Sequence, residues 1–171
     1  MREFYDSIPS LRLRAFFLVA ASCGLRLGEI LSLRIGSDVD FEKRMLTPDN
    51  HNGQTKCSWV SFYNEEAEKV LVEYLGSMTS LQKKSGKLFP ISSRDFKEEW
   101  VNAKIKTGIG LKVKDLRDWF CCEMGRLGVQ DKYVDAFCGR VPQSVLARHY
   151  TDYSPERLKE IYDKANLRVF V

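Results

Sequence analysis

The chain has 171 residues, 44% of them hydrophobic, which is enough to bury one sizeable core as a single domain. Its formal net charge of +4 is compatible with a polyanionic partner but does not require one. The sequence contains no run of about 18 or more apolar residues and opens without an apolar signal segment, so we expect a cytoplasmic protein that neither crosses a membrane nor carries a secretory leader.

The cysteines predict neither a zinc site nor a disulfide framework. They are odd in number and form no Cys-x-x-Cys pair, and only His51 and His149 could join them as ligands. We therefore expect reduced, mostly buried side chains that act as small hydrophobes, and no metal or other cofactor. These cysteines are Cys23, Cys57, Cys121, Cys122 and Cys138.

The N-terminal part is expected to form two helices followed by a hairpin. Ser7–Ser10 begins a helix that ends at Gly24, and a shorter helix with inward Ile30, Leu31 and Leu33 follows. From residue 38 to residue 63, the spacing of the apolar residues changes from a helical period to the alternation typical of a strand. Two strands are predicted, with the turn-rich segment 49–54 between them and one more short strand nearby; they span 44–47 and 58–63.

The remainder is predicted to be helical. Asn64 caps a helix that ends at Gly76, and the polar segment 77–87 is expected to be a loop. Further helices are predicted over residues 93–106, 114–126, 130–137, 143–150 and 154–166. The predicted fold is therefore α+β, a mostly helical single domain over residues 1–171 with a small antiparallel sheet.

Cations gather around one tyrosine in the second half of the sequence. Lys114 and Arg117 are three residues apart, so on a helix they project from one face, within reach of a single small anion. Arg140 follows a glycine that can end a helix, and Tyr150 comes ten residues later. Clustered positive charge stabilises a phenolate and the charge that develops on an attacked phosphate. The pattern therefore suggests phosphoryl transfer through a phosphotyrosine link.

Two further cations each allow two interpretations. Arg26 lies near the start of a helix, where an anion is welcome, or it pairs with Glu29 three residues on. Lys56 stands alone beside the hairpin turn, where it reaches a leaving oxygen or a base edge, or only keeps an edge strand soluble. Lys97, Lys104 and Lys106 form a basic run that a solvated helix face would also explain.

Four segments resemble the motifs of the tyrosine recombinases, the family of phage integrases and Xer-type enzymes. The first arginine motif of that family is similar to residues 24–29, Gly-Leu-Arg-Leu-Gly-Glu. Its later motifs resemble Leu116-Arg117, Gly139-Arg140 and His149-Tyr150-Thr151, in the same order and at typical spacings. The resemblance covers the chain from about residue 9 to residue 151.

This resemblance implies a DNA strand-cleaving and rejoining domain that uses no metal or nucleotide cofactor. Arg26 and Arg117 would clamp the scissile phosphate, Lys56 would protonate the leaving 5′-oxygen, and Tyr150 would be the nucleophile. Double-stranded DNA would be the partner, with self-association on it. The same scaffold would also suit a DNA-binding regulator without chemistry, or a relaxing topoisomerase with the same active-site plan.

The sequence departs from the family at two positions. Lys114 stands where the family usually has histidine, and Arg140 where it has histidine or tryptophan. Both side chains can donate to a phosphate, but neither is a natural base near neutral pH, so Lys114 would accept a proton only if burial lowered its pKa. This pair resembles the one in integrases of spindle-shaped archaeal viruses. The N-terminal DNA-gripping domain of the family is not expected here, because the first motif begins within the first thirty residues.

Residues near the C-terminus leave two choices. Tyr153 is a rival nucleophile, but we favour Tyr150, since Tyr153 directly precedes the Ser154-Pro155 helix start and suits a hydrophobic staple. Residues 154–171 form an amphipathic helix and a tail with a strand-like alternation. This segment is expected to fold onto its own core, with docking on a neighbouring protomer as the alternative that the resemblance suggests.

Overall fold

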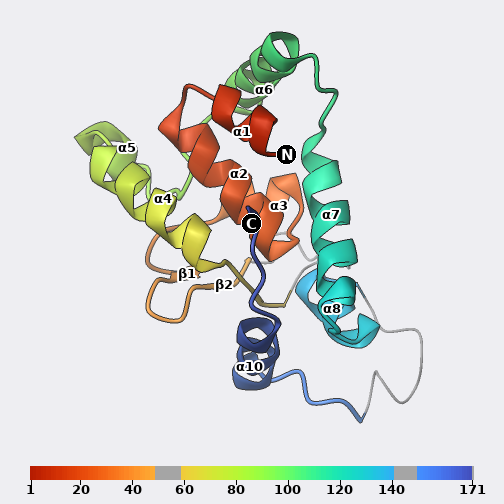
Figure 1. Cartoon of the computed structure of the whole chain (residues 1–171). Coiled ribbons are helices and arrows are strands. Elements are labelled where there is room, and N and C mark those ends of the chain that lie inside the picture. Colours follow the sequence, from red (N-terminus) through yellow and green to blue (C-terminus); the bar gives the residue numbers. More distant parts are fainter. Residues whose placement is uncertain (49–58, 141–149, 171) are drawn as a thin grey trace.

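The computed structural model describes residues 1–48, 59–140 and 150–170, and Figure 1 shows the arrangement. Helices account for most of these residues, and three very short strands form one sheet. The helices are α1 (Arg2–Ser7), α2 (Leu11–Cys23), α3 (Leu27–Ser32), α4 (Glu65–Ser77), α5 (Ser80–Lys84), α6 (Ser93–Thr107), α7 (Val113–Arg126), α8 (Asp131–Phe137) and α10 (Pro155–Ala165). The strands are β1 (Val39–Asp40), β2 (Met45–Leu46) and β3 (Ser61–Phe62).

Helix α2 is the centre of the fold. The Ser10 side chain caps its N-terminus by accepting a hydrogen bond from the Leu13 N–H, and Gly24 ends it in the left-handed region at φ 66°. Between these caps nearly every side chain is buried, as expected for a helix that is apolar on all sides. Helices α4 and α7 pack against it, so α7, which carries the Leu116-Arg117 motif, lies directly beside α2.

The small sheet is antiparallel in the order β1-β2-β3, with Val39 paired to Leu46 and Met45 paired to Phe62. It is fixed to α2 through β3, where the Ser61 hydroxyl donates to the carbonyl of Cys23. Only β2 and β3 lie within the predicted hairpin strands, both shorter than predicted, and the extra strand is β1. The predicted turn at 49–54 lies outside the described residues.

The buried side chains form two clusters. The larger one joins α2 to α1, α4, α6 and α7, with edge and stacked contacts among Phe16, Phe96 and Trp100. The smaller one joins β3, α7, α8 and α10 around Phe137, which meets Phe120 and Tyr162 edge-on. Helix α7 contributes to both clusters and so couples the two halves of the core.

Gly24 is required where α2 ends beside α7 and α8. A Cβ added at this glycine would lie 2.4 Å from Phe120 Cδ1 and 3.1 Å from Cys138 Sγ, and its φ is positive. Gly24→Ala should therefore lower the free energy of unfolding by about 2 kcal/mol or more, from backbone strain and overpacking together. Urea unfolding measures the loss. Gly28→Ala is the matched control, because a Cβ there meets nothing within 4 Å; an equal loss in both variants would contradict this account.

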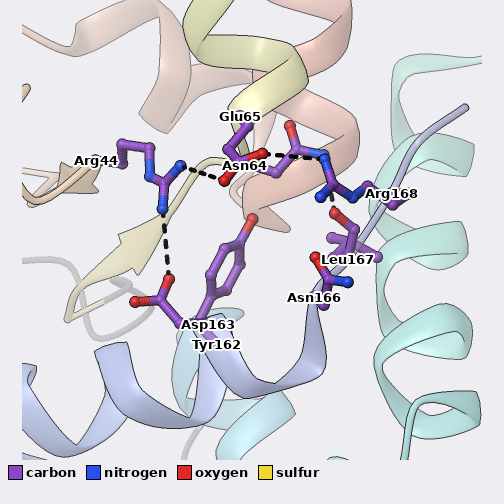
Figure 2. Close-up of a pocket in the computed structure, with 8 residues that line it drawn as sticks. All are labelled: Arg44, Asn64, Glu65, Tyr162, Asp163, Asn166, Leu167 and Arg168. Atoms are coloured by element: carbon purple, nitrogen blue, oxygen red, sulfur yellow. Dashed lines mark hydrogen bonds and ion pairs between the residues drawn. The ribbon is translucent and has the colours of Figure 1, made fainter.

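The C-terminal segment folds back onto the core of its own chain. The Tyr162 hydroxyl donates to the Ser22 carbonyl at 2.8 Å, which fixes α10 to the end of α2. Arg44 reaches Glu65 on α4 and Asp163 on α10, and the Asn64 amide donates to the Leu167 carbonyl (Figure 2). These residues line a small polar pocket of about 140 Å³. In this single chain, α10 therefore contacts the chain's own core.

The last residues are held at the N-terminus of α4 and beside α1. The Glu66 carboxylate accepts hydrogen bonds from the Val169 and Phe170 N–H groups at 2.5 and 3.0 Å. Phe170 then lies against Tyr5 at a ring-centroid distance of 4.9 Å, with the Arg2 guanidinium over its ring. Both ends of the chain therefore meet on one face of α2 (Figure 1).

The Glu66 contacts make a second stability prediction. Glu66→Gln replaces one carboxylate oxygen by an NH₂ donor that faces a backbone N–H, so we expect a loss of about 1–3 kcal/mol in the free energy of unfolding. The neighbouring Glu65 makes exposed ion pairs with Arg44 and Arg168, and Glu65→Gln should cost less than about 1 kcal/mol. Thermal and urea unfolding of both variants test this, and a larger loss for Glu65→Gln would refute it.

Three local expectations are wrong. Residues 2–7 form α1, in which the Ser7 hydroxyl donates to the Phe4 carbonyl, whereas the sequence predicts a first helix that starts only at residues 7–10. Within the predicted loop 77–87, Thr79 and Gln82 form a capping box that starts α5. The described tail, up to residue 170, is not a strand, because its N–H groups bond to the Glu66 carboxylate instead of to a β-ladder.

No helix in the described ranges combines the length and apolar character that a bilayer span requires.

Candidate active site

Arg117 lies at the junction of three segments that carry the sequence motifs. It projects from α7, and its Nη1 and Nη2 atoms donate to the carbonyls of Gly24 and Cys138 at 2.6 and 2.7 Å. Gly24 ends α2 two residues before Arg26, and Cys138 ends α8 two residues before Arg140. The half-buried guanidinium therefore fixes the backbone on both sides of the site and remains partly open to solvent.

Arg26 occupies the N-cap position of α3. Its backbone N–H donates to the Glu29 carboxylate at 2.7 Å, and its Nη1 lies 3.2 Å from the other Glu29 oxygen. The pairing with Glu29 that the sequence allowed is thus present, while 36% of the arginine side chain is exposed. An ion pair that keeps the guanidinium partly exposed orients it without preventing contact with a further anion, so the two interpretations of Arg26 are compatible.

Arg140 follows the glycine turn after α8, where Gly139 has φ 62°. Its backbone N–H donates to the Asp135 carbonyl at 2.8 Å, and its Nη1 lies 3.2 Å from the Asp135 carboxylate. The hydrogen bond with Cys138, and then the nearby positive charges of Arg140 and Arg117, lower the pKa of the Cys121 thiol on α7. Arg117 and Arg140 are therefore both close to Cys121, for which the sequence predicts only the role of a small hydrophobe.

Lys114 lies one turn before Arg117 on α7, as predicted from the spacing. Its side chain is 80% exposed, and its Nζ lies 3.8 Å from the Asp118 carboxylate. The burial on which a proton-accepting lysine would depend is absent at this position. Lys114 is thus placed as a mobile surface charge that can donate to a phosphate.

The two tyrosines differ in exposure. Tyr150 is 78% exposed, whereas Tyr153 packs edge-on against Tyr133 and its hydroxyl is buried. That packing fits the staple role predicted for Tyr153, directly before the Ser154 cap of α10. The described residues record no hydrogen bond between the Tyr150 hydroxyl and Arg117 or Arg140. The structure therefore brings the arginines together and leaves the tyrosine beside solvent.

Lys56, the predicted hairpin lysine, lies outside the described residues, as does the predicted helix 143–150 up to residue 149. Within the described part of the chain, no group of three or more His, Cys, Asp or Glu side chains could hold a metal ion. The described cysteines are free, as expected, but they are not uniformly buried. Cys23 and Cys138 are buried, Cys121 is half-buried and Cys122 is exposed.

Comparison with known proteins identifies the family. The model of the phage integrase family matches residues 1–157, which is most of the chain and includes every predicted site residue. The chain belongs to the phage integrase family. The fold and the recombinase scaffold implied by the sequence motifs are thereby confirmed.

Solved structures agree with this fold. A crystal structure of XerA recombinase is similar with a TM-score of 0.65 and 24% identity, over 98% of this chain and 62% of that one. The integrase of mycobacterium phage Brujita is similar with a TM-score of 0.68 and 19% identity, over 99% of this chain and 57% of that one. The chain thus spans about three fifths of their length. A sequence comparison with curated proteins gives no match.

Proposed function

We propose that the chain is the catalytic domain of a site-specific DNA recombinase that cleaves and rejoins DNA strands through a 3′-phosphotyrosyl intermediate. The main support is Arg117, whose two backbone contacts hold the segments that carry Arg26 and Arg140 on either side of it. Three guanidiniums around a shared surface suit the non-bridging oxygens of one phosphodiester. Family membership supplies the second line of support.

In the proposed reaction the Tyr150 oxygen attacks the scissile phosphorus, and the bond from phosphorus to the 5′-oxygen breaks. Arg26, Arg117 and Arg140 stabilise the charge that develops on the phosphate, and the exposed Lys114 adds a further donor. Lys56 gives its proton to the leaving 5′-oxygen. The phenolic proton goes to solvent, to which the Tyr150 side chain is exposed. Rejoining is the same step in reverse, with a 5′-hydroxyl as nucleophile.

The exposure of Tyr150 supports a cycle in which DNA completes the site. In the free chain the arginines are fixed by backbone contacts while the tyrosine faces solvent. A bound phosphodiester would place its anionic oxygens against the arginines and its phosphorus within reach of the Tyr150 oxygen. We further propose that double-stranded DNA is the partner and that protomers associate on it.

The direct test is a duplex with a nick placed near the scissile phosphate, so that the short cleaved strand diffuses away and the intermediate accumulates. We expect a covalent protein–DNA species on denaturing gels in buffer that contains EDTA. A protein that binds this duplex but forms no adduct would instead be a non-catalytic DNA-binding protein. Relaxation of supercoiled DNA without any recombination site would identify a topoisomerase activity.

A further inference from the structure

Two cysteines meet beside the arginines of the site. The Cys121 and Cys138 sulfur atoms are 3.4 Å apart, although 17 residues separate them in the sequence. Cys121 lies on α7 and is half-buried, whereas Cys138 ends α8 and is buried. The Cys121 sulfur is therefore accessible to small reagents, and the buried Cys138 sulfur is in contact with it.

Their surroundings make the accessible thiol the reactive one. A hydrogen bond with Cys138 and the nearby Arg140 and Arg117 guanidiniums lower the pKa of Cys121 to about 6, against burial, which raises it. The contact with Cys121 and burial raise the pKa of Cys138. The lowered pKa favours the thiolate of Cys121, which is the form that reacts with oxidants, and the Cys138 thiol lies within hydrogen-bond distance of it. Cys23 contrasts with both, since burial raises its pKa to about 12.

Both sulfurs are connected to the proposed phosphate site. The carbonyl of Cys138 accepts a hydrogen bond from Arg117 at 2.7 Å, and Arg140 follows two residues later. After the contact with Cys138, the nearby positive charge of Arg140 is a further cause of the lowered pKa of Cys121. The Cys138 sulfur lies above Gly24, where an added Cβ would be 3.1 Å away. Any shift of this pair therefore displaces groups that hold two arginines of the site.

We propose that Cys121 and Cys138 are a reversible thiol–disulfide pair that switches the recombinase site off when a peroxide oxidises it. The inference rests on the proposed function for its effect on cleavage, but not for the bond itself. The Cys121 thiolate attacks one oxygen of hydrogen peroxide and the O–O bond breaks; with one proton taken up from solvent, the products are a sulfenic acid and one water. The Cys138 thiol then attacks that sulfur, forming the disulfide and releasing a second water. The two electrons lost by the sulfurs reduce the peroxide, and a dithiol reductant reverses the step.

Disulfide formation would disturb the site in two ways. The sulfurs must approach from 3.4 Å to a bond of about 2.05 Å, which moves α7 and the end of α8 toward each other. Arg140 also loses the anionic sulfur that helps to hold it. Displacements of this size at a phosphate-binding arginine are expected to slow the chemical step more than DNA binding.

The experiment uses the full chain, fully reduced and then treated with hydrogen peroxide. Remaining thiols are alkylated, and peptides are mapped by mass spectrometry. We expect Cys121 and Cys138 in one linked peptide pair, lighter by two hydrogens, with Cys122 alkylated. Cleavage of the nicked duplex should fall by about tenfold or more and recover with dithiothreitol. Cys121→Ser should make cleavage insensitive to peroxide, while Cys122→Ser, at the exposed neighbour, should leave the response unchanged.

The outcomes separate the two proposals. Alkylation of both Cys121 and Cys138 after peroxide treatment would overturn the pair, and a disulfide that leaves cleavage unchanged would overturn the switch. If the reduced protein forms no adduct at all, the proposed function fails. The peptide map still decides whether the disulfide forms, and DNA affinity measured before and after oxidation then shows whether it alters the surface.

Discussion

Tyr150→Phe should abolish the covalent protein–DNA adduct and leave DNA affinity within a small factor of that of the wild type. Removing the hydroxyl removes the only atom that can form the phosphotyrosyl bond in the proposed reaction, yet it changes no charge. The side chain is 78% exposed, so the substitution also leaves the core untouched. Adduct formation on the nicked duplex and fluorescence anisotropy of a labelled duplex measure the two quantities.

Tyr153→Phe is the control for this experiment. Its ring packs against Tyr133 and its buried hydroxyl has no hydrogen-bond partner in the described structure, so phenylalanine retains the packing. Tyr153→Phe should therefore form the adduct at close to the wild-type rate. An adduct that persists in Tyr150→Phe and disappears in Tyr153→Phe would transfer the nucleophile to Tyr153.

Arg117→Lys should lower the rate of cleavage by about 10²-fold or more, with DNA affinity reduced only a few-fold. Lysine keeps the charge, but it lacks the planar fork whose two nitrogens reach the Gly24 and Cys138 carbonyls, so both the directed phosphate donors and the support of the neighbouring segments are weakened. Single-turnover cleavage and anisotropy are measured on the same duplex. Urea unfolding should show an accompanying loss of about 1–3 kcal/mol, from two half-buried carbonyls left without their donors.

Arg126→Lys is the matched control on the same helix. Arg126 pairs with Glu123 at the exposed end of α7, and lysine there should change neither cleavage nor affinity measurably. If Arg117→Lys weakened binding and cleavage by equal factors, the arginine would serve binding alone. That result would favour the DNA-binding regulator over the recombinase.

Much of the fold could be predicted because its signals are local. Ser10, Asn64 and Ser154 cap helices where expected, and Gly24 ends one, since a side-chain acceptor or a positive φ acts within one turn. The tail was predicted wrongly because its alternation suggests a strand. Its partner is a carboxylate about 100 residues earlier in the sequence, which no local pattern reveals.

The site was predictable in its residue types but not in its connections. Spacing placed Lys114 and Arg117 on one helix, yet nothing in the sequence indicated that Arg117 would bind the carbonyls of Gly24 and Cys138. The sequence also did not indicate that Cys121 would lie near Arg140, because their proximity depends on how α7 and α8 pack. Cysteine spacing excluded a metal motif, but it said nothing about two sulfurs that meet only after folding.

The docking of α10 sets a tether for the proposed nucleophile. Helix α10 is fixed to α2 through Tyr162 and Ser22, and its N-terminus begins at the Ser154 cap. Four residues separate Ser154 from Tyr150, and a fully extended chain spans at most about 3.6 Å per residue, so the Tyr150 backbone can travel no more than about 14 Å from that cap. While α10 stays docked, the scissile phosphate must lie within reach of a tyrosine restricted to this distance from the cap, whichever protomer binds that phosphate. A longer reach for Tyr150 would require release of the hydrogen bond between Tyr162 and Ser22. The distance over which Tyr150 can move therefore depends on how stably α10 is docked.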